Sequence, residues 1–164
     1  MRVYVPLTLP GLAEAHRTGQ LGDGPFPAHA VTPALREWYD SDDLEELEYA
    51  ALSGAALASL RLLAADAGAP RRRVVVAVDV SDETALPAPD GSAPGEVRVA
   101  GAVRLAKAAA VHVDAADAET DVAAAARALP AADGGDDDAQ DTVDGAGDHE
   151  LLWFATQEIP HLIG

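Results

Sequence analysis

The side chains that could move a proton lie in two separate regions of this chain. His112 and Asp114 are two positions apart on a predicted strand, so both would project from the same face. His149 stands between Asp148 and Glu150 at the start of the predicted last strand. An imidazole beside a carboxylate can act as an acid or a base near neutral pH. These residues form one candidate site, and the alternative is that Asp114 caps a helix while the histidines are structural.

Basic residues are concentrated between Arg71 and Lys107, where positive and negative charges nearly cancel. Arg98 and Arg104 in this stretch are candidates for binding an anion. The alternative is that the arginines flank strands and pair with the protein's own carboxylates. Any such anion site would lie close to the strand ends.

Two aromatic pairs, Trp38-Tyr39 and Trp153-Phe154, supply much of a scarce aromatic content of 4%. Aromatic side chains usually serve packing, so we expect one member of each pair to be buried and the other to lie at an edge. The alternative is a ligand pocket or a surface patch for a partner. Trp153 is therefore the aromatic candidate for a site.

An acidic stretch precedes the second pair. Its carboxylates are Asp133, Asp136, Asp137, Asp138, Asp141, Asp144, Asp148 and Glu150. Counted as an EF-hand loop from Asp133, the stretch places Asp138 where glycine should form the turn and Asp144 where glutamate should be bidentate. We therefore predict no dedicated metal site, only weak and nonspecific cation binding, and a solvent-exposed loop at about residues 131 to 148.

Motifs of the well-known enzyme classes are missing from the sequence. There is no cysteine, no phosphate-binding glycine loop, no dinucleotide fingerprint, no nucleophile elbow and no zincin helix. The sequence thus predicts no cofactor and leaves catalytic residues unknown. We expect a non-enzymatic binding or regulatory protein; the alternative is a small-molecule-binding enzyme with a His/Arg/carboxylate site near strand ends.

The formal charge of -17 bears on the choice of partner. A field of this sign repels the phosphates of nucleic acids and anionic lipids, so we expect neither nucleic acid nor membrane as a partner. A protein partner, or a second copy of the chain, is expected instead. A rigid acidic mimic of nucleic acid is a further hypothesis, which needs regularly spaced carboxylates. The N-terminal residues do not resemble a signal peptide, and the expected location is the cytoplasm.

The elements that position these residues follow from the apolar pattern. Apolar residues at steps of three and four predict a long helix over residues 42 to 67, with Asp42 as its cap. The nearly continuous apolar run of residues 74 to 80 predicts a central strand. Residues 96 to 101 alternate as a half-exposed strand, expected to pair antiparallel with it. A second helix should start at Asp114 and stop at Pro130.

Together these elements predict a single α+β domain over residues 1 to 164. We expect a mixed β-sheet with split β-α-β units and the long helix packed on one face. The last apolar residues, 157 to 163, are too few to fold alone and should dock on the domain or on another chain.

Five stretches resemble a family of actinobacterial proteins that carry a domain of unknown function. They are RVYVPLTLP at residues 2 to 10, AVTPALR at 30 to 36, LEYAA at 47 to 51, ASLRLL at 58 to 63 and ELLWFATQE at 150 to 158. Membership would imply a stand-alone cytoplasmic domain. It implies no established activity, so it assigns no catalytic residues.

Overall fold

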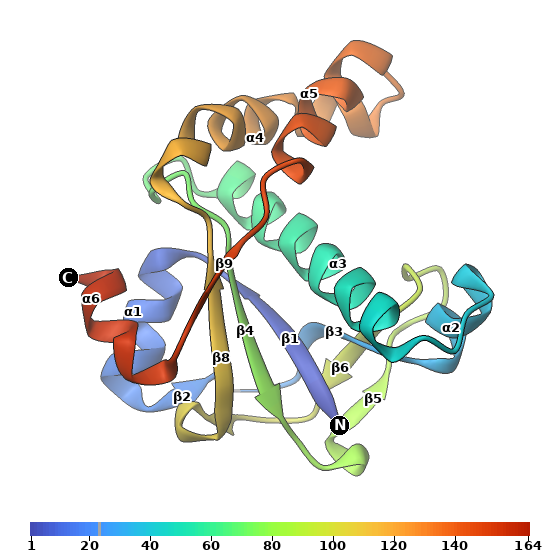
Figure 1. Ribbon diagram of the computed structural model, residues 1–164, viewed down its shortest axis with the longest axis vertical. Helices are drawn as coiled ribbons and strands as arrows, with labels where there is room; N and C mark the ends of the chain where they lie inside the picture. Colours follow the sequence, from blue (N-terminus) through green and yellow to red (C-terminus); the bar gives the residue numbers. More distant parts are fainter. Residues whose placement is uncertain (23) are drawn as a thin grey trace.

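In the computed structural model, which describes residues 1–22 and 24–164, the chain builds one seven-stranded sheet with helices on both faces (Figure 1). The strands lie in the order β5-β6-β3-β1-β4-β8-β9. Their bounds are β1 Arg2–Leu7, β3 Phe26–Ala30, β4 Val74–Asp79, β5 Ala85–Pro87, β6 Glu96–Val99, β8 Ala108–Val113 and β9 Leu152–Phe154. A second small sheet joins β2, Gln20–Leu21, to β7, Val103–Arg104.

The predicted α+β class is confirmed, and so is a split β-α-β unit. β3 and β4 each pair antiparallel with β1 from opposite sides, so they run parallel to each other with β1 between them. The chain connects them through α2, Pro33–Tyr39, and α3, Leu44–Ala65. The predicted mixed sheet is wrong, because every strand pair among the described residues is antiparallel. The parallel strands are separated by β1 and therefore share no hydrogen bonds.

α3 is the predicted long helix, and it crosses one face of the sheet (Figure 1). Its cap is Asp43 and not Asp42: the Asp43 carboxylate accepts a hydrogen bond from the backbone N–H of Glu45 at 3.1 Å. By length and mean hydropathy alone, α3 could cross a bilayer. In the folded chain it packs instead on β1, β3 and β4, and its C-terminal half packs on α4.

Alternate residues of the sheet enter two separate cores, as the period of two requires. Tyr4, Val75 and Ala77 pack under α3. Val3 and Val5 pack on the opposite face with α1, Leu9–Thr18, and α6, Ile159–Ile163. α6 lies against α1 with Ile159 fully buried, which confirms that the segment 157 to 163 docks on the domain.

The predicted acidic loop at 131 to 148 is wrong, because this stretch belongs to a helical hairpin. α4, Glu119–Asp133, turns at Gly135 into α5, Asp137–Gly147, and the Asp136 carboxylate caps α5 by accepting from the N–H of Ala139 at 2.9 Å. Val143 and Ala146 of α5 are buried in a third core with α3 and α4. Val143 and Ala146 are three positions apart, so they share one face of α5. This short apolar face is hard to recognise in the sequence because carboxylates surround it.

Three further expectations are corrected. β6 pairs with β3 and β5 rather than with β4, since β1 and β8 occupy both sides of β4. Pro130 does not end α4, which continues to Asp133. Short 3-10 turns cover residues Asp82–Thr84, Leu105–Lys107, Ala116–Ala118 and Thr156–Glu158. Trp38 and Tyr39 are both exposed, so the expected burial of one member fails for that pair.

Candidate functional site

A groove runs along α3 on the face of the sheet that α3 covers. One part, of about 360 Å³, lies between α3, β8, β9 and the segment that connects α5 to β9. It is lined by Tyr49, Leu52, Ser53, Ala56, Arg73, His112, Gly147, His149, Glu150, Leu151 and Trp153. A second part, of about 340 Å³, lies between α3 and α5 and shares Ser53, Arg73 and Gly147 with the first. We call the two parts together the α3–β9 groove.

The register of β8 and β9 brings two of the predicted candidates into this groove. His112 is the cross-strand partner of Trp153. Val111 and Val113 point into the core under α1 and α6, so His112 between them points to the α3 side. Trp153 lies beside it at the edge of the sheet and is 62% exposed, whereas Phe154 is half-buried against the core.

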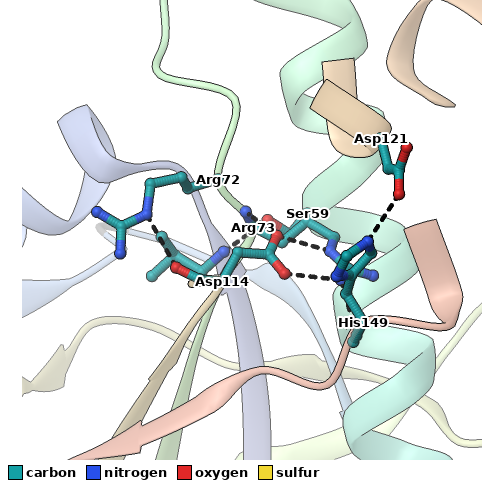
Figure 2. Close-up of polar contacts among 7 residues, drawn as sticks. Ser59, Arg72, Arg73, Asp114, Asp121 and His149 are labelled. Carbon is teal, nitrogen blue, oxygen red and sulfur yellow. Dashed lines mark hydrogen bonds and ion pairs between the residues drawn. The ribbon is translucent and has the colours of Figure 1, made fainter. Parts of the chain in front are cut away.

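Under the groove lies a buried ion pair between Arg73 and Asp114 (Figure 2). Arg73 donates from Nε to Asp114 Oδ2 at 2.8 Å and from Nη2 to Oδ1 at 2.7 Å, and its backbone N–H also donates to Oδ2 at 2.8 Å. Arg73 is 4% exposed and Asp114 is not exposed at all. A buried carboxylate is tolerated only with this degree of pairing.

This pair corrects one interpretation and confirms another. Asp114 is not a helix cap, because its carboxylate is held by Arg73 and α4 begins only at Glu119. The expectation that the arginines answer the protein's own carboxylates holds for Arg73. Arg72 joins the same cluster through a 2.9 Å hydrogen bond from its Nε to the carbonyl oxygen of Asp114.

His149 forms one wall of the groove, and Arg73 holds this wall in place. Its Nη2 donates to the carbonyl oxygen of His149 at 3.0 Å. The His149 ring contacts α4 in turn, with 2.7 Å between Nε2 and Asp121 Oδ2 (Figure 2). The segment between α5 and β9 is thus tied to the sheet through its backbone and to the helical hairpin through its side chain.

His112 has the character of a neutral imidazole. Burial lowers its pKa below the ordinary value for histidine, and the positive charge of Arg2 lowers the pKa further. Near neutral pH the ring can donate one hydrogen bond and accept another, but it contributes no positive charge to the groove.

The charge that the groove presents is negative. Asp144, Asp148 and Glu150 line it, and none of them forms an ion pair with any residue in the ranges 1–22 and 24–164. The guanidinium of Arg73 is neutralised by Asp114. A positively charged ligand is therefore favoured at this groove.

The remaining candidates lie elsewhere. Arg98 is exposed on β6, at the far side of the sheet, and Arg104 lies on β7. Arg104 lines a separate hollow of about 200 Å³ together with Lys107. Within the described residues, no group of three His, Cys, Asp or Glu side chains has the arrangement of a metal site.

Sequence reasoning missed Tyr49 and the position of Arg73. Tyr49 is 56% exposed on α3, and its position outside the apolar stripe that predicts the helix was the signal available in the sequence. Arg73 immediately precedes an apolar strand, which marks it as a residue at the edge of the core. Its partner, 41 positions further along the chain, carries no local signal.

Comparison with known proteins identifies a family. A search of curated proteins and a search of solved structures each found no match to the chain. A model described as a family of unknown function (DUF6912) matches residues 1–163, in agreement with the resemblance to an uncharacterised domain. Because the match covers nearly all of the sequence, the chain belongs to this family of unknown function.

Proposed function

We propose that this protein is a binding domain whose α3–β9 groove takes a basic segment of another protein, anchored by a large apolar side chain. The observation that carries the proposal is the meeting of exposed aromatic side chains and unpaired carboxylates in one groove. Tyr49 and Trp153 are 56% and 62% exposed there, beside Asp144, Asp148 and Glu150.

The charge of the groove supports a basic partner. Carboxylates that form no ion pair attract Lys or Arg side chains of a partner. The formal charge of -17 adds a long-range negative field that attracts the same side chains. The same charge opposes self-association, since two copies would repel each other. It also disfavours nucleic acids and anionic membranes as partners.

The aromatic side chains support an apolar anchor. Tyr and Trp are enriched among the residues that dominate binding energy in protein interfaces, because each buries a large area at a small cost in conformational entropy. Leu52 and Leu151 are half-buried next to them in the same part of the groove. An apolar side chain of the partner would cover this surface and remove it from water.

The test measures binding of short blocked peptides by calorimetry. Peptides with a central Phe or Leu flanked by Lys and Arg should bind, and the same peptides with Glu in the flanks should not. Trp153→Ala should weaken binding about tenfold or more, as expected for a central aromatic contact. The matched control is Trp38→Ala, because Trp38 is also highly exposed, at 72%, but lies on α2 away from the groove. Equal losses in both variants, or no preference for basic flanks, would contradict the proposal.

A second candidate function, a small-molecule-binding enzyme, is supported by one observation: His112 and His149 both line the groove. His112→Gln separates the two functions, because it removes an acid–base group and leaves the aromatic and acidic walls in place. Peptide affinity should be nearly unchanged in this variant if the protein is a binding domain. An enzyme that uses His112 would lose its activity.

We also propose a cytoplasmic location and an origin in an actinobacterial genome. The support is compositional: one lysine stands against ten arginines, there is no cysteine, and alanine, glycine and aspartate are abundant. Fractionation of the native host would test the location.

A further inference from the structure

One nitrogen of the buried guanidinium of Arg73, Nη1, has no hydrogen-bond partner among the described residues. Nε and Nη2 donate to Asp114, and Nη2 also donates to the carbonyl oxygen of His149. Among the residues that the structure describes, none accepts a hydrogen bond from Nη1. An arginine offers five N–H donors, so the two on Nη1 stay available.

The free Nη1 group is assigned to the α3–β9 groove. No fully buried side-chain nitrogen or oxygen lacks a partner within the described part of the chain, so Nη1 must reach solvent. Arg73 is 4% exposed, and it lines both parts of the groove, at their junction with Ser53 and Gly147. The small contact of Arg73 with solvent is therefore a contact with the floor of the groove.

We propose that Arg73 Nη1 donates a hydrogen bond to a main-chain carbonyl oxygen of the bound segment. This inference rests on the proposed function and assigns the group that the floor of the groove recognises. A neutral acceptor is favoured because the charge of Arg73 is already neutralised by Asp114. An anionic group would also approach Asp144, Asp148 and Glu150, which repel it.

The surroundings of Arg73 suit the approach of a peptide backbone. Gly147 lines both parts of the groove, and a Cβ at this position would meet no atom within 4 Å, so the space beside it is open. The rigid pairing with Asp114 holds the guanidinium in place before the partner arrives, which lowers the entropic cost of the new hydrogen bond. A main-chain carbonyl is present in every peptide, so the contact fixes the position of the segment while the walls select its side chains.

The direct test is NMR of the guanidinium nitrogens in the ¹⁵N-labelled wild-type protein. Addition of a blocked Lys/Arg peptide with a central Phe should shift the Arg73 Nη1 resonance, with the same dissociation constant that calorimetry gives. Sodium acetate at equal ionic strength should leave the resonance in place. A larger or tighter response to acetate would overturn the inference in favour of an anionic ligand.

The outcomes separate this inference from the proposed function. If calorimetry shows binding that depends on Trp153 while the Nη1 resonance does not move, the contact at Arg73 is wrong and the binding function stands. If no basic peptide binds at all, both fail.

A variant adds an independent measurement. Arg73→Lys keeps a positive charge beside Asp114 but removes the planar fork. We expect the dissociation constant of the peptide to rise about tenfold or more, in line with the loss of one charge-assisted hydrogen bond. An unchanged affinity in a variant that melts as one cooperative unit would overturn the inference. If the variant does not fold, the NMR measurement on the wild type decides alone.

Discussion

The imidazole of His29 on β3 lies directly against the backbone of Gly54 in the middle of α3. A Cβ at position 54 would stand 2.8 Å from His29 Nδ1, which is closer than atoms in contact can come. Gly54 therefore allows α3 to lie close to the sheet at the point where the buried side chain of His29 projects from β3 toward the helix.

We expect Gly54→Ala to destabilise the fold. Alanine is favoured over glycine in a helix by about 1 kcal/mol, but forced overpacking costs about 1–3 kcal/mol, so the balance is unfavourable. Gly145→Ala is the matched control, because Gly145 lies within α5 and a Cβ there meets nothing within 4 Å. The control should be neutral or stabilising in urea unfolding. If His29→Ala does not relieve the effect of Gly54→Ala in a double-mutant cycle, the contact is not its cause.

We expect the stability of the protein to fall as the pH is lowered below the ordinary histidine pKa of 6.5. Burial lowers the pKa of His29 and of His112 in the folded protein, although Glu96 opposes the shift at His29. Just below pH 6.5 the unfolded chain then binds more protons than the folded one. The free energy of unfolding therefore rises with pH in this range and decreases on acidification. Urea midpoints between neutral and mildly acidic pH measure the effect.

Replacement of both histidines should flatten this pH dependence. His29→Gln/His112→Gln serves for the comparison, and His16→Gln is the control, since His16 is exposed on α1. An equally steep loss of stability in the double variant would assign the effect to other groups.

We expect Asp114→Asn to be among the most destabilising isosteric changes in the chain. It leaves the guanidinium of Arg73 buried without its counter-charge, which costs about 3–5 kcal/mol in comparable sites. Asp133→Asn breaks the exposed pair with Arg61 and should have a much smaller effect, because water and salt already screen that pair. Chemical denaturation followed by circular dichroism compares the two, and similar losses would argue against a special role for the buried pair.

We expect Gly147→Leu to weaken peptide binding without weakening the fold. The new side chain enters open space, and Gly147 borders both parts of the α3–β9 groove, so the side chain competes with a bound segment. Gly145→Leu is the control on the same helix, at a position that does not line the groove. Calorimetry of both variants with the same peptide measures the difference, which should be tenfold or more in the dissociation constant if the groove is the site. Intact affinity in Gly147→Leu would place the peptide elsewhere.

The parts of the fold that could be predicted are those with a strong local pattern. The apolar residues of α3 recur with helical spacing over more than 20 positions, and the valines of β4 form a continuous buried run. α5 was missed, and with it the hairpin that it forms with α4, because its two buried residues, Val143 and Ala146, stand among many carboxylates. The acidic composition of the segment suggests a loop, whereas the burial of these two residues stabilises a helix.

The candidate site was predictable in its residue types but not in its assembly. His112, His149 and Trp153 do meet in one groove, yet Arg98 and Arg104 do not join them. The role of Asp114 was misread because a local helix cap and a pairing 41 positions away look the same in the sequence. Non-local contacts of this kind follow from the order of strands: β4 lies beside β8 because the intervening strands β5, β6 and β7 pair elsewhere.

The packing of α1 against α6 has a consequence for the nascent chain. Leu12 on α1 and Ile159 at the start of α6 belong to the same core, so the apolar face of α1 has no complete cover until residue 159 has left the ribosome. A contact between such distant positions slows folding, because a large part of the chain must be ordered first. During synthesis this apolar face is exposed to chaperones and to other nascent chains.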